Sequence, residues 1–529
     1  MNPIPLYDRT LATLSRRDLL KIAWTLGASA VALPWTERRA LAKPIFHAYP
    51  FSLGVASGDP LSGSVVLWTR VAPEPLEGGG MPMAPVEVEW ELARDRLFQT
   101  LEQKGKVIAF PEIGHSVHVD VTGLEPGREY WYRFRAGGEI SQTGRTKTAP
   151  ADGAMVDHLR FAVCGCSHFE SGYFTAYRAL AAENFDFIFH TGDYIYEYRA
   201  NGGQDLSRVR QHHGNEVYTI VDYRNRYAQY KSDPNLIAAH ASAPFVLSWD
   251  DHEVEDNYAG DVDQNSTPIE LFLLRRAAAY QAYYEHMPLR ASSFPSGSHM
   301  RIYRRLQFGN LIDLSVLDTR QWRSDQACGD GARTDCAEAL DPARTMLGAE
   351  QERWLFDNLP TVRARWTVLG QQVYSFARDM AKAAPAGRFS MDKWDGYVAA
   401  RNRLYARLKE TRAPNPIVIS GDVHQHFGAD LKLDFANPRS ETIGVEFTNT
   451  SISAGGDGTD VAPNWDLIKG DNPHIKYHSA RRGYIACTAS QAAMRADFKI
   501  LNRVTVPDQP ATVGGSLVVE AGRPGALAG

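Results

Sequence analysis

Residues 185–196 read FDFIFHTGDYIY and decide the fold. The run from Phe185 to Phe189 is rich in aromatic and β-branched residues, which is typical of a short buried strand. It passes directly into a polar loop that carries Gly192, Asp193 and Tyr196. A buried strand ending in a loop of reactive side chains indicates an α/β core, where ligands gather beyond the carboxyl ends of the strands.

The same unit occurs four more times along the chain. Apolar runs at residues 159–163, 245–247, 366–369 and 417–419 each lead into a polar loop, with longer helical segments between them. The loops read CSH at 166–168, WDDHE at 249–253, QQ at 371–372 and GDVH at 421–424. Because the ends of such strands share one edge of a sheet, we expect these loops to converge.

Residues 44–150 have the pattern of an all-β unit. Residues 65–68 and 86–90 have strand composition, and alternating strands at 117–121 and 130–134 flank a Leu-Glu-Pro-Gly turn. This arrangement is typical of the end of a fibronectin type III-like β-sandwich. We therefore predict a sandwich domain over residues 44–150, serving as scaffold, and a catalytic domain over residues 157–529.

Residues 1–42 resemble a twin-arginine export signal rather than part of the fold. The run SRRDLLK at 15–21 precedes an apolar stretch from Ile22 to Leu33, and ALA at 40–42 fits a cleavage site. The apolar stretch is shorter than the roughly 20 residues that cross a bilayer. We expect the twin-arginine machinery to deliver a soluble mature chain without a transmembrane segment to the periplasm or the medium. The alternative is a basic amphipathic helix that stays attached as an anchor.

Export would place the five cysteines in an oxidising compartment. Cys328 and Cys336 stand eight residues apart in a Gly/Asp-rich stretch, and we predict a loop disulfide between them. Cys164 and Cys487 lie in apolar strands and have the character of buried, inert thiols.

Composition excludes several classes of protein. The 529 residues are 44% hydrophobic and 22% charged, as in ordinary globular proteins and unlike disordered, collagen-like or coiled-coil chains. The formal net charge of −5 gives no basic footprint for nucleic acid.

The converging loops carry a thiol, several carboxylates, a phenol and two imidazoles. An Asp after a strand is usually a helix cap, and a single His is seldom a ligand, so each group alone is weak evidence. Four successive strand ends that all present metal-binding groups are better explained by one site. The sequence therefore predicts a mixed-ligand cluster of two metal ions.

The motifs resemble those of the PhoD-like alkaline phosphatases and phosphodiesterases, a branch of the calcineurin-like metallophosphoesterases related to purple acid phosphatases. The resemblance rests on FSLGVASGDP at 51–60, LWTR at 67–70, Cys166 with GYF at 172–174, GDYIYE at 192–197, WDDHE at 249–253, LDTR at 317–320 and GDVH at 421–424. It implies a four-layer α/β/β/α core behind the sandwich.

The resemblance also implies a ligand set and its metals. Asp193 would bridge two ions, one of them a ferric ion (Fe3+) held also by Cys166, Tyr196 and His424. The second ion would be bound by Asp251 and by Asp422, which stands where many relatives have histidine. Carboxylates in that place favour a hard ion, and the family implies one or two Ca2+ beside one iron. Residues that a further Ca2+ would use are Asp250, Asp256 and Asn257, which are equally well explained as caps and turn residues.

The implied activity is hydrolysis of phosphate monoesters, diesters or both by metal-activated hydroxide. His252 would donate a proton to the leaving group, or alternatively orient Asp251. Arg320 would hold the phosphate oxygens, or alternatively form an ion pair with Asp318 or another acid.

Three alternative functions stay open at this point. A phospholipase D-like or polymer-directed phosphodiesterase would differ in the mouth of the site, which we expect segments 199–231 and 323–346 to shape. A non-catalytic, metal-dependent protein that binds cell-surface polymer would lack one ligand of the cluster, and a redox protein would use the iron alone.

Overall fold

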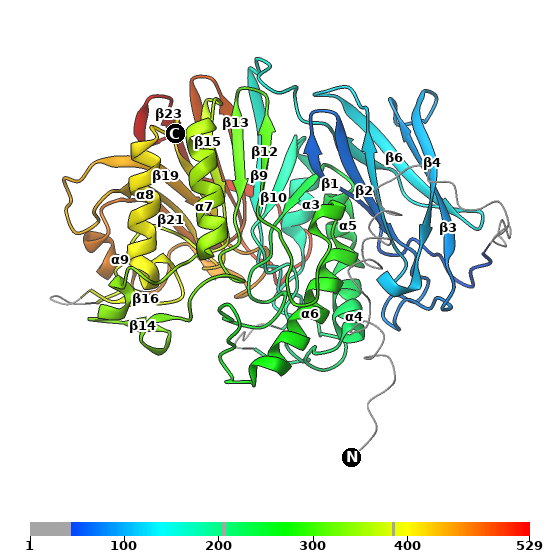
Figure 1. Cartoon of the computed structure of the whole chain (residues 1–529), viewed down its shortest axis with the longest axis horizontal. Helices are drawn as coiled ribbons and strands as arrows, with labels where there is room; N and C mark the ends of the chain where they lie inside the picture. The colour runs from blue at the N-terminus through cyan, green and yellow to red at the C-terminus, as the bar shows by residue number, and fades with distance from the viewer. Residues whose placement is uncertain (1–43, 204–207, 383–386) are drawn as a thin grey trace.

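The computed structural model describes residues 44–203, 208–382 and 387–529. The predicted export signal, residues 1–42, lies outside the described residues. The described chain forms a β-sandwich beside a larger core of two stacked sheets with helices on both outer faces (Figure 1). None of the described helices is both long and apolar enough to cross a membrane.

The sandwich consists of two antiparallel sheets around an apolar core. One sheet contains β1 (Val55–Leu61), β2 (Ser64–Arg70) and β5 (Ser116–Thr122). The other contains β3 (Val86–Ala93), β4 (Leu101–Ala109), β6 (Glu129–Ala136), β7 (Glu139–Ile140) and β8 (Gly144–Lys147). Inward-facing residues such as Leu67, Val88 and Phe134 fill the space between them.

The first sheet of the larger core begins with three parallel strands. These are β9 (His158–Cys164), β10 (Phe187–His190) and β11 (Phe245–Leu247), the predicted strands that precede the polar loops. The sheet continues through the antiparallel strands β21 (Ile475–Ser490), β22 (Ala493–Leu501), β23 (Ala511–Glu520) and β24 (Arg523–Ala528).

The second sheet faces the first and has its own parallel centre. Strands β13 (Ile312–Val316), β15 (Trp366–Gly370), β17 (Ile417–Ser420) and β19 (Thr442–Thr448) run parallel. Strands β12 (Arg304–Phe308) and β18 (His426–Lys432) flank them in the antiparallel sense. The long strand β21 also pairs with β18, so it belongs to both sheets.

Helices complete the predicted four layers. The first sheet is covered by α3 (Thr175–Ala182), α4 (Ile220–Lys231), α5 (Pro234–His240) and α6 (Ile269–His286), and the second by α7 (Gly348–Asn358) and α8 (Val398–Glu410). The short strands β14 (Ala332–Arg333) and β16 (Phe389–Ser390) form a separate pair, β20 (Gly458–Thr459) pairs with β21, and α9 (Trp465–Ile468) is a single short helix. A third apolar cluster lies between the sheets, which confirms the α/β/β/α arrangement.

The sandwich is joined to the core by strand pairing as well as by the chain. β1 runs parallel to β11 where Gly58 pairs with Phe245. A Cβ atom at Gly58 would lie 2.3 Å from the carbonyl oxygen of Pro288, so only glycine permits this close approach. Trp68 reinforces the joint by donating a hydrogen bond to the carbonyl oxygen of Glu285 at 3.0 Å.

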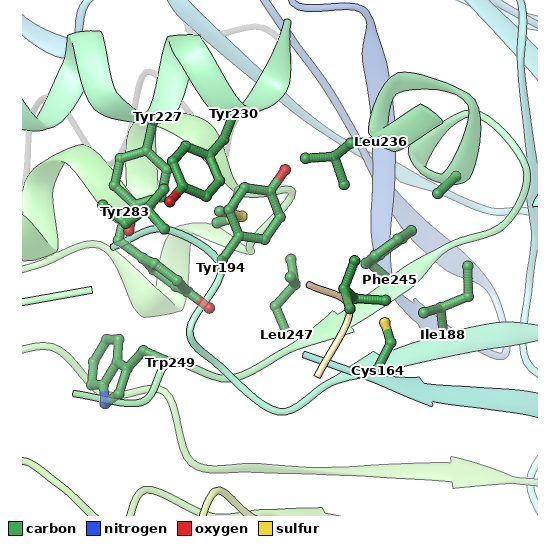
Figure 2. Packing of buried hydrophobic residues seen from close by; sticks show 14 of the residues in the cluster. Cys164, Ile188, Tyr194, Tyr227, Tyr230, Leu236, Phe245, Leu247, Trp249 and Tyr283 are labelled. Atoms are coloured by element: carbon green, nitrogen blue, oxygen red, sulfur yellow. The ribbon is translucent and has the colours of Figure 1, made fainter. Parts of the chain in front are cut away.

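The cysteines divide as expected. Cys328 and Cys336 form the predicted disulfide, and Cys164 and Cys487 are free and buried. Figure 2 shows the Cys164 side chain among Ile188, Phe245 and Leu247, in the apolar packing beneath α5.

Candidate metal centre

The loops that follow β9, β10, β11 and β17 meet at one edge of the core. The backbone N–H groups of Cys166 and Ser167 donate to the carbonyl oxygens of Gly192 and Asp193 at 3.0 and 2.8 Å. Gly192 has a φ of +112°, and a Cβ atom there would lie 2.3 Å from the backbone nitrogen of Asp250. The first three loops are therefore packed backbone against backbone, as only a glycine at position 192 allows.

Four of the six predicted ligands have a left-handed backbone. The φ angles are +59° at Cys166, +52° at Asp193, +70° at Asp422 and +56° at His424. Non-glycine residues rarely adopt this conformation, and such residues concentrate at functional sites because the surrounding structure must hold them there. In each case the turn carries the side chain from the end of a strand into the shared site.

One part of the site, which we call the sulfur side, consists of Cys166, Asp193, Tyr196 and His424. The Tyr196 hydroxyl donates to Oδ2 of Asp193 at 3.0 Å and contacts Nε2 of His424 at 3.1 Å. Ligand atoms of Cys166, Asp193 and His424 lie within 4.8 Å of one another. Four different donor types thus meet at one point.

Burial controls the ionisation of the sulfur side. It raises the pKa of the Cys166 thiol well above its ordinary value, and the charge of Asp193 raises that pKa further. Burial and Asp193 raise the pKa of Tyr196 in the same way. Both groups would stay protonated by themselves, whereas a bound cation favours the thiolate and phenolate forms.

The other part, the carboxylate side, consists of Asp250, Asp251, Asp392 and Asp422 around Arg320. Arg320 is fully buried and bonds to Oδ1 of Asp250 through Nε. Its two terminal nitrogens donate to Asp392 and Asp422, both at 2.9 Å. Oxygens of Asp250, Asp251 and Asp422 also lie within 4.8 Å of one another. This side offers only oxygen ligands.

These contacts bear on the two roles that the sequence left open for Arg320. The side chain forms ion pairs with Asp250, Asp392 and Asp422, and Asp318 instead accepts a hydrogen bond from the Arg320 backbone at 3.0 Å. The geometry therefore favours the ion-pair role. A role toward substrate stays a prediction.

Carboxylate oxygens on both sides of the centre have unmet bonding capacity that a cation would satisfy. Among the described residues, Asp193 Oδ1, Asp250 Oδ2 and Asp251 Oδ1 are buried and accept no hydrogen bond. Arg320 lies 3.6 Å from Asp251 Oδ1, beyond hydrogen-bond distance, and buried carboxylate oxygens that accept no hydrogen bond are costly unless they coordinate an ion. Burial also raises the pKa of Asp193 and of Asp250 well above the ordinary value, so the charged forms of both carboxyl groups are disfavoured by themselves. A bound cation would compensate that charge and favour the ionised forms. The donor set thus fits a pair of metal ions.

His252 lies between the two sides. Its Nδ1 contacts Oε2 of Glu197 at 2.8 Å, and one ring nitrogen lies within 4.8 Å of oxygens of Asp193 and Asp251. Burial by itself would lower the pKa of His252, but the charges of Glu197, Asp251 and Asp193 raise it well above its ordinary value. The imidazole therefore lies at the edge of the centre among the carboxylates of Glu197, Asp251 and Asp193, and its role as proton donor stays a prediction.

The sequence did not single out three residues that hold the site together. Glu253 accepts hydrogen bonds from the backbone N–H groups of Asp193, Tyr194 and Asp250 at 3.0, 2.7 and 2.8 Å, so it ties two loops together. Asp392 and Lys393 pair with Arg320 and Asp422, respectively. Glu253 stands within the quoted WDDHE block, whereas no motif marks Asp392 or Lys393.

Of the residues outlined for a further Ca2+, Asp250 belongs to the carboxylate side, and Asp256 and Asn257 lie beside it, partly exposed. Asp256 accepts a hydrogen bond from the Tyr198 hydroxyl at 2.8 Å. The side-chain amide of Asn257 donates to Asp330 at 3.3 Å, and its backbone N–H donates to Asp251 at 2.7 Å. Both residues thus make hydrogen bonds to neighbouring side chains, and a further Ca2+ at this place stays a prediction.

Three comparisons with known proteins, by family model, by sequence and by structure, all match this chain to the same kind of phosphatase. The family model described as PhoD-like phosphatase matches residues 161–498, and its N-terminal domain model matches residues 37–150. Alkaline phosphatase D of Bacillus subtilis (strain 168) is 49% identical over 518 residues, which cover 97% of this chain and 89% of that protein. A solved structure described as "Structure of PhoD" matches with a TM-score of 0.90 and 48% identity, over 92% of this chain and 93% of that one.

Proposed function

The chain belongs to the PhoD-like phosphatases and hydrolyses phosphate esters, and from this premise we propose that it does so at a mixed iron and calcium centre, after export by the twin-arginine route. The observation that carries the proposal is the division of the centre into a side with sulfur, phenol and imidazole donors and a side with carboxylates alone. The family membership favours an enzyme over the non-catalytic and redox alternatives.

The sulfur side supports the proposal of one Fe3+. Cys166, Tyr196 and His424 would bind it, and Asp193 would bridge it to the neighbouring ion. Thiolate and phenolate are strong anionic donors that suit a ferric ion, and both need a cation to ionise in a buried site.

The carboxylate side supports the proposal of Ca2+. Asp193, Asp251 and Asp422 would bind it, and Asp250 has a buried oxygen aimed at the same region. Oxygen donors without sulfur or imidazole favour a hard ion. A second Ca2+ near Asp250, Asp256 and Asn257 would have to compete with the hydrogen bonds that the last two residues already make.

When bound, the two cations supply charge neutralisation for the phosphate oxygens and lower the pKa of water enough to provide hydroxide at working pH. The chain's own residues orient and shield the reaction. Arg320 holds Asp250, Asp392 and Asp422 in place, and in the proposal it also faces the phosphate. His252 would donate a proton to the leaving oxygen, so that the product departs as an alcohol.

The class of ester is part of the proposal as well. The name of the Bacillus subtilis relative supports a phosphomonoesterase, while phosphodiester cleavage, including phospholipase D-like or polymer-directed cleavage, is the second candidate. Tyr198 lies directly before segment 199–231, and Tyr218 lies within it. The half-exposed Tyr218 ring packs against the Arg275 guanidinium, whose central carbon is 4.2 Å from the ring centroid. Arg275 is buried and paired with Glu216 and Glu255, so this contact does not make a basic surface and favours neither class of ester.

The test combines metal analysis with two substrates. Purified mature protein should contain about one iron and one or two calcium ions per chain, and chelator should remove activity that added Ca2+ restores. The rates with p-nitrophenyl phosphate and with its bis-ester then separate monoesterase from diesterase. Full activity in protein stripped of both metals would overturn the iron–calcium proposal.

A further inference from the structure

We propose that Glu197 is a positioning residue for the reaction, because it fixes the His252 ring so that Nε2 is presented to the leaving oxygen of the ester. The inference rests on the proposed function, in which His252 is the proton donor. Neither the motif comparison nor the ligand set assigns a role to Glu197.

Glu197 holds His252 and the loop that carries it with one carboxylate. Oε2 contacts Nδ1 of His252 at 2.8 Å, and Oε1 accepts a hydrogen bond from the backbone N–H of Asp256 at 3.0 Å. The side chain of Glu197 is 1% exposed, so this contact is shielded from water. Ring and backbone are thus fixed to the same buried group.

Two tyrosine rings restrict the imidazole further. The His252 ring lies 4.1 Å from the Tyr196 ring at an interplanar angle of 33°, and 5.3 Å from the Tyr198 ring at 67°. Both rings come from the segment that carries Glu197. The imidazole therefore has two aromatic neighbours besides the contact at Nδ1, and in the proposal Nε2 is the nitrogen that faces the ester.

The hydrogen bond at Nδ1 decides which nitrogen can act. A carboxylate that accepts the Nδ1 proton fixes the ring orientation and leaves Nε2 for chemistry. Nε2 of His252 lies 3.9 Å from Oδ1 of Asp256, which is too far for a hydrogen bond. Asp256 therefore does not occupy the nitrogen that the proposal assigns to proton transfer. Glu197 thus acts through His252 and does not touch the ester itself.

The proton and electrons balance in this step. Hydroxide derived from water forms the new phosphorus–oxygen bond, and as the ester bond breaks, its electron pair passes to the leaving oxygen, which takes the proton from Nε2. Water returns a proton to Nε2 after the product has left. Nδ1 keeps its proton and its bond to Glu197 throughout, so the carboxylate is not consumed.

The distinguishing measurement is the dependence of the rate on the leaving group. p-Nitrophenolate leaves without help, whereas phenolate needs a proton donor, so loss of the donor's orientation should affect phenyl phosphate more. We expect Glu197→Ala to lower kcat for phenyl phosphate about 10- to 100-fold and for p-nitrophenyl phosphate less than about 5-fold, with KM and metal content unchanged.

Matched variants make the test specific. Glu255 is a buried glutamate of the same region that pairs with Arg275 at 2.8 Å and not with His252, so Glu255→Gln should leave the ratio of the two rates unchanged. His252→Asn should produce the same selective loss as Glu197→Ala, and the double variant should add little to it. If Glu197→Ala does not fold, Glu197→Gln keeps the volume and carries the test.

The outcomes separate this inference from the proposed function. Equal loss for both esters, or fully additive effects of the Glu197 and His252 variants, would overturn the positioning role. Absence of iron and calcium in the parent protein would overturn the proposed centre instead, whatever the leaving-group dependence. A selective loss in metal-dependent parent protein supports both.

Discussion

The two sides of the centre are held by different kinds of contact. On the sulfur side the proposed ligands contact one another, as Tyr196 does with Asp193 and His424 at 3.0 and 3.1 Å. On the carboxylate side the proposed ligands form ion pairs with two positively charged side chains: Arg320 pairs with Asp250 and Asp422, and Lys393 pairs with Asp422. Neither Arg320 nor Lys393 belongs to the loops that carry Asp250 and Asp422. One side depends on contacts among the proposed ligands themselves, and the other on ion pairs with Arg320 and Lys393.

This difference predicts how each side responds to substitution. Because the proposed ligands of the sulfur side contact one another, loss of one of them should release the proposed iron. On the carboxylate side each acidic side chain belongs to a network of several ion pairs, so losing one pair leaves the others in place. The loss still leaves a buried charge without compensation. The variants below change the sides separately or together.

The largest effect is expected at the residue shared by both sides. Asp193→Asn removes the anionic bridge, so hydrolysis of both p-nitrophenyl phosphate and its bis-ester should fall by at least about 1,000-fold, in line with loss of metal-based activation. Steady-state kinetics with metal analysis measures this.

Asp186 provides the control for that change. It also lies beside β10, but it binds Lys147 and the backbone of Arg160 at 2.6 and 2.7 Å, away from the centre. Asp186→Asn should keep most of the activity. An Asp193→Asn variant that retains a tenth of the parent rate would rule out the bridging role.

The next effect should be confined to the sulfur side. Cys166→Ala removes the thiolate, so the visible charge-transfer absorption and most of the iron should disappear while calcium binding persists; Tyr196→Phe should act in the same direction. Cys164→Ala is the matched control, because that thiol is equally buried but lies in apolar packing (Figure 2). Equal colour in the two alanine variants would show that Cys166 is not a ligand.

The fold could be predicted where its signal is local. Each proposed ligand lies in a polar loop that follows a short apolar run, and these runs form β9, β10, β11 and β17. The joint between β1 and β11 had no such signal, because it depends on the close approach of Gly58 to Pro288, which are 230 positions apart in the sequence. Pairings of that kind depend on the whole chain.

The site divides in the same way. Cys166, Asp193 and His424 stand in motifs directly after strands, so the residues around them identify them. Asp392 and Lys393 follow the two-residue strand β16 in a segment without a pattern, and their importance comes only from contact with Arg320 and Asp422. The sequence left Arg320 either to bind phosphate or to pair with Asp318 or another acid, and the structure pairs it with Asp250, Asp392 and Asp422.

A smaller effect should appear on the carboxylate side alone. Asp392→Asn removes a carboxylate that binds Arg320, Arg323 and Lys393, so those cations should lose their fixed positions. We expect Ca2+ affinity or kcat/KM to fall about 10- to 100-fold, as for outer partners of metal ligands. The absorption of the sulfur side should stay unchanged, and loss of colour would show that the two sides are not separable in this way. Calcium titration followed by turnover and visible spectra would measure both.

The smallest effect is expected from loss of the Cys328–Cys336 disulfide. Whether that loss changes calcium dependence or iron content tests the separation of the two sides. The Cys328–Cys336 loop supports the carboxylate side only: the backbone N–H of Met391 donates to the Gly331 carbonyl oxygen at 2.8 Å, directly before Asp392. Replacing both cysteines with serine removes a cross-link that is worth about 2–3 kcal/mol in the chain-entropy account, so the loop should loosen. Because Arg320 and Arg323 still hold Asp392, turnover at saturating Ca2+ should change less than about 3-fold, while the Ca2+ concentration for half activity rises by a similar factor. Iron content and colour should not change, because the described contacts of the sulfur side do not reach this loop. A loss of iron with unchanged calcium dependence would therefore reverse the assignment of the loop to the carboxylate side.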